Sequence, residues 1–237
     1  MDFTKFLSLL ESEKLYFTRS DRFDDPFEGA VPLSNVMARG NSIRQLFDEH
    51  KDIPDSAKMA IADWEIDKPD HNRATKKYVA LNCWHMNEHE SAAMWKLYLH
   101  GPEGIAIQST YQQLRDSIID EEPVQIGCVK YIDYEKDGFH EHTLFTAFVH
   151  KRKSFEHERE VRACIWKPPI TANGLDYQLE TIGQGLTIKV DIKSLIQKLY
   201  IAPTAQSWFA ELAKSVMAKY GFDFEVVHSG LFSVPLF

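Results

Sequence analysis

Short β-prone runs recur along the whole chain, and segments with the apolar spacing of a helix separate them. The helical segments are short, for example at 3–10, 91–99 and 205–219, and no repeat or flexible linker interrupts the alternation. Strands mixed with helices in this way are typical of an α+β protein. We therefore predict a single α+β domain over residues 1–237, with a largely antiparallel sheet flanked by helices. The β-prone runs are residues 15–18, 78–86, 104–110, 124–134, 158–166, 198–203 and 223–229.

Size and cysteine content indicate a core that needs no covalent or metal support. The chain has 237 residues, of which 44% are apolar, and a chain of this length buries roughly 70% of its unfolded surface. Its cysteines, Cys83, Cys128 and Cys164, are widely spaced without a CxxC pair, which argues against a disulfide framework or a zinc knuckle. The histidines also lack HExxH or another paired spacing, so we predict no metal site.

Two further segments have helical spacing. Residues 41–77 are the most polar part of the chain, with apolar positions such as Ile43 and Trp64 and a break at Pro69, and we interpret them as a helical insertion. Residues 142–152 space their large apolar side chains as the buried face of a helix does. Asp2 and Ser91 are suited to cap the helices that follow them.

Charge and hydropathy limit the kinds of partner. There are 35 acidic and 27 basic residues, a net charge of −8, which argues against broad, salt-dependent nucleic-acid binding. No apolar run approaches the ~20 residues that cross a bilayer, and the charged start of the chain does not resemble a signal peptide. We expect a cytoplasmic protein without a membrane partner.

The segment 19–29, which overlaps a charged loop expected at residues 20–32, contains the first candidate site. Pro26 forbids a regular ladder of hydrogen bonds there, and arginines and carboxylates are concentrated around it. Such a group suits a polar ligand. Alternatively, the carboxylates cap the turn before Pro26 and pair with the arginines. The candidate residues are Arg19, Arg22, Asp25 and Glu28.

The run 158–166 contains the second candidate site. Residues two apart on a strand share a face, so we expect Glu158, Glu160 and Arg162 to line up. The two carboxylates would raise each other's pKa and Arg162 would lower it, which leaves one protonated near neutral pH and the other ionised. This row fits a catalytic or binding function, and it also fits a solvated strand face of salt bridges.

The third candidate site lies near residues 83–98. Trp95 and Tyr98 are three apart on one helical face and either form a stacking wall for a planar ring or belong to the core. Cys83 and His85 point the same way on a strand, but no third group that would orient a nucleophile is evident, which favours a structural cysteine.

Four pieces of the chain contain these candidate residues and are spread in order between residues 15 and 162: LYFTRSDRFDDPFEG (15–29), ALNCWHMNEHESAAMWKLYLHGPEGIAIQST (80–110), VKYIDY (129–134) and KRKSFEHEREVR (151–162). In this order they resemble a widespread bacterial family that is catalogued as a domain of unknown function. The resemblance implies a bacterial protein, and the family has no settled reaction.

The order of these motifs is also similar to that of the ADP-ribosyltransferase-like fold, in which a split antiparallel sheet holds NAD and a Glu-x-Glu pair performs the transfer. This resemblance implies that Glu160 hydrogen-bonds the nicotinamide ribose and stabilises the developing oxocarbenium charge. Glu158 would orient the acceptor nucleophile, and Trp95 or Tyr98 would stack near the nicotinamide. The remaining residues of the implied NAD site are Arg19, Arg22, Asp25, Glu28 and Arg162.

Many members of the family carry a short strand ahead of the first helix, where transferases of this type place an arginine or histidine that holds NAD. The sequence begins at Met1, just after that point. Three expectations follow from the resemblance: Arg19 or Arg22 substitutes, this form lacks part of the site, or the true start lies upstream.

These observations lead to three functional hypotheses of different classes. The first is an enzyme that uses NAD or a related nucleotide as substrate and transfers ADP-ribose to an unknown acceptor. The alternative is a non-catalytic module, in a stress or phage-defence setting, that binds a nucleotide or a protein and in which Glu160 pairs with Arg162 or Arg22. A hydrolase that uses Cys83 or the paired carboxylates is a third interpretation, although no oxyanion hole is evident.

Overall fold

The computed structural model describes residues 1–237 except 62–73, 100, 141–142, 144, 173 and 235–237. The described residues form an α+β fold, as predicted. They divide into two compact units, each assembled from separate parts of the chain. Unit 1 contains residues 1–16, 87–123 and 187–237, and unit 2 contains residues 17–86 and 124–186.

Unit 1 contains a three-stranded sheet with the order β12–β11–β3. Strand β11 is parallel to β12 and antiparallel to β3. The predicted caps are present, because the side chain of Asp2 accepts from the backbone of Lys5 and that of Ser91 accepts from the backbone of Met94. The elements are α1 (Phe3–Ser12), α4 (Ala92–Tyr98), β3 (Ile105–Gln108), α5 (Tyr111–Ser117), α6 (Ile192–Leu195), β11 (Lys198–Ile201), α7 (Ser207–Lys219) and β12 (Glu225–His228).

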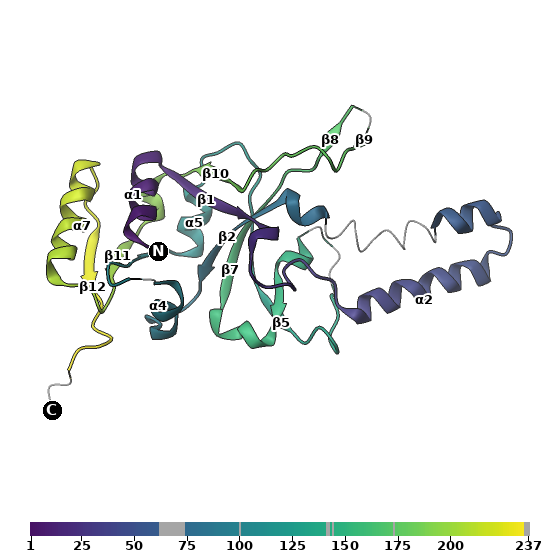
Figure 1. Ribbon diagram of the computed structural model, residues 1–237, viewed down its shortest axis with the longest axis horizontal. Helices are drawn as coiled ribbons and strands as arrows, with labels where there is room; N and C mark the ends of the chain where they lie inside the picture. The colour runs from purple at the N-terminus through teal and green to yellow at the C-terminus, as the bar shows by residue number, and fades with distance from the viewer. Residues whose placement is uncertain (62–73, 100, 141–142, 144, 173, 235–237) are drawn as a thin grey trace. The chain divides into compact units, whose positions relative to one another are not determined.

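Unit 2 contains most of a five-stranded sheet with the order β10–β1–β2–β7–β4, and Figure 1 shows β1, β2 and β7 side by side. Strand β7 is antiparallel to both β2 and β4, and β1 is antiparallel to β2. The strands are β1 (Lys14–Arg19), β2 (Val79–His85), β4 (Gln125–Cys128), β7 (Glu160–Trp166) and β10 (Gly185–Lys189).

Smaller elements complete unit 2. Strands β5 (Lys130–Ile132) and β6 (His150–Arg152) pair in parallel, and β8 (Ile170–Thr171) forms a short hairpin with β9 (Gly174–Leu175). The other elements are η1 (Ser20–Arg22), α2 (Leu33–Glu49), η2 (Lys76–Tyr78), η3 (Thr146–Phe148) and η4 (Lys153–Glu158).

Strand β7 is the most buried strand of unit 2. Its residues are buried from Glu160 to Ile165, and only Trp166 is exposed. Its Cys164 forms an apolar cluster with Val79, Leu81 and Phe148. An unpaired buried charge is costly, so a charged side chain on a strand that is buried in this way requires a partner.

The prediction of a helix at residues 142–152 is wrong. Residues 146–148 form one short 3₁₀ turn, and residues 150–152 are strand β6. The carbonyl of Phe148 accepts from Arg162 at 2.7 Å, and the carbonyl of Val149 accepts from the backbone of Lys130 at 2.9 Å. These tertiary hydrogen bonds use carbonyls that a continuing helix would need. Residues 141, 142 and 144 lie outside the described residues.

The helical segment that was expected at 41–77 begins earlier. Helix α2 runs from Leu33 to Glu49 behind Pro32, and residues 55–61 are also helical. Trp64 and Pro69 lie outside the described residues. Within the described part of the chain, no helix is both long and apolar enough to span a membrane.

Candidate functional site

The site begins at the turn that precedes β7. Glu158 is the last residue of the 3₁₀ segment η4, and Arg159 has a left-handed backbone (φ 42°, ψ 56°) before β7 starts at Glu160. The expectation that Glu158 lies on the strand and shares a face with Glu160 by alternation is therefore wrong. The two side chains nevertheless meet at one lysine, because both carboxylates bind the Nζ of Lys151.

Lys151 joins the two carboxylates. Its Nζ donates to Oε1 of Glu160 at 2.8 Å and to Oε2 of Glu158. Lys151 lies on β6, and its side chain is only 9% exposed. Its ammonium also lies 4.6 Å from the centre of the Phe155 ring, a cation–π contact. One buried cation thus neutralises part of the charge of both glutamates.

Arg162 extends this network into the core. It lies two residues after Glu160 on β7, and its Nε donates to Oε2 of Glu160 at 2.5 Å. Its two other nitrogens bind both carboxylate oxygens of Glu28, at 2.7 and 3.0 Å, and Nη1 also donates to the carbonyl of Phe148. The side chain is fully buried. A planar guanidinium suits this task because its donors match the two oxygens of a carboxylate.

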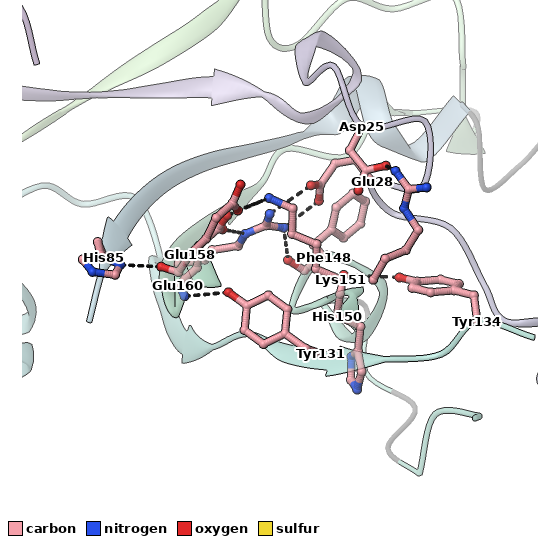
Figure 2. Close-up of polar contacts among 12 residues, drawn as sticks. Asp25, Glu28, His85, Tyr131, Tyr134, Phe148, His150, Lys151, Glu158 and Glu160 are labelled. Carbon is pink, nitrogen blue, oxygen red and sulfur yellow. Dashed lines mark hydrogen bonds and ion pairs between the residues drawn. The ribbon is translucent and has the colours of Figure 1, made fainter. Parts of the chain in front are cut away.

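These groups form one chain of alternating charges, which we call the ionic cluster: Glu28, Arg162, Glu160, Lys151 and Glu158. Figure 2 labels its three glutamates and Lys151. All of its members lie in unit 2. Glu158 forms one end, and its side chain is the most exposed of the five, at 12%. Each charge in such a buried cluster has lost contact with water, and the attraction of its neighbour offsets that cost only while the fold keeps the two together.

A second ion pair joins Asp25 and Arg152. Oδ1 of Asp25 accepts from Nη2 of Arg152 at 2.7 Å. The guanidinium of Arg152 lies over the rings of Phe27 and Phe155, at 4.5 and 5.2 Å from their centres. Oδ2 of Asp25 and Nε of Arg152 are buried without a hydrogen-bond partner among the described residues. The loop of residues 20–32 therefore supplies two carboxylates, Asp25 and Glu28, to arginines from elsewhere in the chain.

Two side chains hold the backbone of the glutamate pair. Nδ1 of His85 lies 2.6 Å from the carbonyl of Glu158, and the backbone N–H of Glu160 donates to the hydroxyl of Tyr131 at 2.8 Å. Figure 2 shows these contacts beside the carboxylates. The position of the pair is therefore fixed at the main chain as well as at the side chains.

The environment separates the pKa values of the two carboxyl groups. Burial, together with a hydrogen bond to Glu160, raises the pKa of Glu158 to about 7. Burial opposes ionisation of Glu160, but the hydrogen bond from Glu158 and the charge of Arg162 outweigh it and lower its pKa to about 2. The pair therefore combines a carboxyl group that takes up and releases a proton near neutral pH with one that stays anionic. Two carboxyl groups with separated pKa values can divide the tasks of proton transfer and charge stabilisation between them.

The other predicted site residues lie outside the ionic cluster. Arg19 is buried and is held by Asp21 at 2.7 Å, by Glu180 at 3.1 Å and by the carbonyl of Ile182 at 3.0 Å. Arg22 is exposed. The structure therefore brings together Glu28, Glu158, Glu160 and Arg162, whereas Asp25 pairs with Arg152 and Arg19 belongs to a separate network.

Trp95 and Tyr98 belong to unit 1, whereas the ionic cluster belongs to unit 2. Trp95 is buried and donates from Nε1 to Glu90 at 3.1 Å. Tyr98 is 55% exposed. The two rings thus differ in environment although they are three residues apart on α4.

Cys83 does not have the surroundings of a nucleophile. Burial raises the pKa of its thiol well above the usual value, and the thiolate is the reactive form of cysteine. In the antiparallel register, Cys83 lies opposite Arg162, and His85 lies opposite Glu160. These surroundings argue against the hydrolase interpretation based on Cys83.

Sequence reasoning missed Lys151, Arg152 and Tyr131. Because a helix was expected at residues 142–152, Lys151 and Arg152 were not recognised as residues of a short strand, where they point to opposite faces. A usable signal was present, because this basic pair lies shortly before residues 156–160, which contain three glutamates. Buried carboxylates need nearby cations, so the basic pair could have been matched to them.

The fold and the cluster together define an α+β protein with a buried ionic cluster that ends in a carboxylate pair. Comparison of the chain with models of protein families, with curated proteins and with solved structures found no match. The likeness to a bacterial family of unknown function and to ADP-ribosyltransferases stays a prediction from the sequence.

Proposed function

We propose that the protein is an enzyme that transfers ADP-ribose from NAD to an acceptor of unknown identity. The observation that carries this proposal is the Glu158–Glu160 pair on Lys151, with one carboxyl group that titrates near neutral pH and one that stays anionic. Transfer of this kind needs both, because positive charge develops on the sugar while the acceptor loses a proton.

The proposed step divides the work between the two glutamates. The bond between the ribose C1′ and the nicotinamide nitrogen breaks, nicotinamide leaves as the neutral base, and its bonding electrons go with it. The anionic Glu160 stabilises the oxocarbenium charge that remains on the sugar. The acceptor's oxygen or nitrogen then bonds to C1′ as its proton passes to ionised Glu158, which is available because its pKa lies near neutrality.

The nucleotide contacts follow the placement of the predicted arginines. The guanidinium of Arg19 is committed to Asp21 and Glu180. Arg22 is exposed and leaves its guanidinium accessible, so we assign contact with the pyrophosphate to Arg22.

A second function is favoured by a different observation. Both carboxylate oxygens of Glu160 are occupied by cations, Oε1 by Lys151 and Oε2 by Arg162, and the residue is only 4% exposed. In a non-catalytic binding module, this arrangement would brace the start of β7, and Glu160 would never meet a substrate. Exposed residues such as Arg22 would then bind the ligand.

Glu158→Gln separates the two functions better than a change of Glu160 does. Glu160 lies inside the cluster, so its removal destabilises the fold in either case, by about 3–5 kcal/mol for a broken buried pair. Glu158 lies at the end of the cluster, and glutamine has nearly the same shape as the protonated side chain.

The test measures release of nicotinamide from NAD by the purified chain, with water as the default acceptor, and the thermal shift caused by NAD. An enzyme is expected to release nicotinamide, to lose at least tenfold in rate in Glu158→Gln, and to keep its NAD-induced shift in that variant. Glu225→Gln, which removes one partner of the exposed pair with Lys198, is the control and should retain full activity. A thermal shift without any nicotinamide release supports the binding module. The absence of both nicotinamide release and a thermal shift refutes the use of NAD.

A further inference from the structure

His85 contacts the site through the main chain of Glu158. It is the last residue of β2 and lies opposite Glu160 in the register with β7. Its Nδ1 is 2.6 Å from the carbonyl oxygen of Glu158, and the next backbone N–H, that of Met86, donates to the carbonyl of Arg159 at 2.8 Å. Two consecutive hydrogen bonds thus tie the end of β2 to the turn between the glutamates.

The turn that these bonds hold has an unfavourable backbone. Arg159 has a left-handed conformation, which is disfavoured for a residue with a Cβ and persists where neighbouring contacts enforce it. The backbone N–H of Arg159 also donates to the carbonyl of Glu156, at 3.2 Å. If the hold from β2 were lost, the turn would relax, and the Glu158 carboxylate would leave Lys151.

The hydrogen bond of His85 defines its tautomer. A carbonyl oxygen only accepts hydrogen bonds, so Nδ1 must carry the proton that is shared with Glu158. Nε2 is buried and has no hydrogen-bond partner within the described ranges. Nδ1 is therefore the ring atom through which His85 acts on the site.

We propose that His85 is a positioning residue for the glutamate pair: its Nδ1–H holds the Glu158 carbonyl and fixes the turn that directs the Glu158 carboxylate to Lys151. The catalytic meaning of this role rests on the proposed function, whereas the geometric role does not. It would be present in a binding module as well.

Two amide variants test which ring nitrogen matters. His85→Asn places an N–H close to the position of Nδ1 and is expected to keep the hydrogen bond to Glu158. His85→Gln places its amide near the position of Nε2 and is expected to lose that bond. Because the two variants differ by one methylene group and neither introduces charge, each is the matched control of the other.

The readouts need no substrate. Nitrogen-15 NMR of the native protein is expected to show His85 as the Nδ1–H tautomer. A carbon-13 NMR titration of the side-chain carboxyl groups is expected to keep the pKa of Glu158 near 7 in His85→Asn. In His85→Gln it should shift toward the usual 4.5, because the freed carboxylate returns to water.

Each outcome decides the role of His85. An Nδ1–H tautomer with a lowered pKa of Glu158 only in His85→Gln supports it. The Nε2–H tautomer in the native protein overturns it, and so does a Glu158 pKa that is unchanged in His85→Gln or shifted equally in both variants. If His85→Gln does not fold, the tautomer of the native protein decides alone. Since NAD is absent from these measurements, a failure of the proposed transferase activity leaves their result unaffected.

Discussion

Glu28 and Arg162 lie 134 positions apart in the sequence and form a two-pronged ion pair, with Nη1 to Oε1 at 2.7 Å and Nη2 to Oε2 at 3.0 Å. The side chains are 2% and 0% exposed. This pair joins the loop after β1 to the buried strand β7. The same guanidinium also binds Glu160, so the loop and the candidate catalytic glutamate share one cation.

Removing the charge of Glu28 is expected to destabilise the protein. Glu28→Gln keeps the shape of the side chain but leaves Arg162 with one carboxylate partner, and we expect the free energy of unfolding to fall by about 3 kcal/mol. Urea denaturation measures this change. Glu211→Gln is the control, since the Lys214–Glu211 pair is solvent-exposed and should contribute nothing measurable. Equal stability of Glu28→Gln and the native protein would contradict the structural importance of the pair.

Glu158 should make stability depend on pH. Its folded pKa is raised to about 7 from the usual 4.5, so the folded state holds a proton that the unfolded state releases between these values. Its contribution to stability is full below about pH 4.5 and is lost as the pH rises through 7. The native protein should therefore lose stability from pH 5 to pH 8 relative to Glu158→Gln, which does not titrate. Unfolding free energies of both proteins that stay parallel over this range would refute the raised pKa.

Glu160 should act in the opposite direction at lower pH. Its folded pKa is depressed to about 2, so the stability that it contributes is present above about pH 4.5 and is lost as the pH falls toward 2. Melting curves of Glu160→Gln and the native protein between pH 6 and pH 2.5 measure this effect. The difference in stability between them should shrink on acidification, and a constant difference would contradict the assignment.

Lys151 should control the pKa values of both glutamates. Its ammonium favours the ionised form of Glu158 and of Glu160, so Lys151→Gln is expected to raise both pKa values in a carbon-13 NMR titration. Lys153→Gln is a close control, because Lys153 pairs with the partly exposed Asp137 and has no contact with the glutamate pair in the described structure. The prediction fails if both variants give the native titration curves.

The thiols should differ in reactivity. Cys128 is exposed, whereas burial raises the pKa of the Cys83 and Cys164 thiols. A thiol reagent is therefore expected to modify Cys128 rapidly in the native protein, the partly exposed Cys83 slowly and the buried Cys164 only after unfolding. Cys128→Ser should abolish the rapid phase. Rapid modification of Cys83 in that variant would revive the interpretation of Cys83 as a nucleophile.

Local sequence signals predicted the elements that depend on near neighbours. The caps at Asp2 and Ser91 and the strand around 79–85 are present as expected, because capping and apolar spacing act within a few residues. The segment 142–152 shows where such signals fail. Its apolar spacing fits a helix, yet hydrogen bonds to Arg162 and Lys130 decide its backbone.

The sequence by itself determined the α+β class and the contact between Glu160 and Arg162, since two residues on one strand face are neighbours wherever the strand lies. Only the tertiary structure decided that Glu28 and Lys151 neutralise them and that Glu158 reaches the same lysine from a left-handed turn. The physical reason is desolvation: a charge on a buried strand must find its partner from distant parts of the chain. Spacing along the sequence does not encode which distant residue that is.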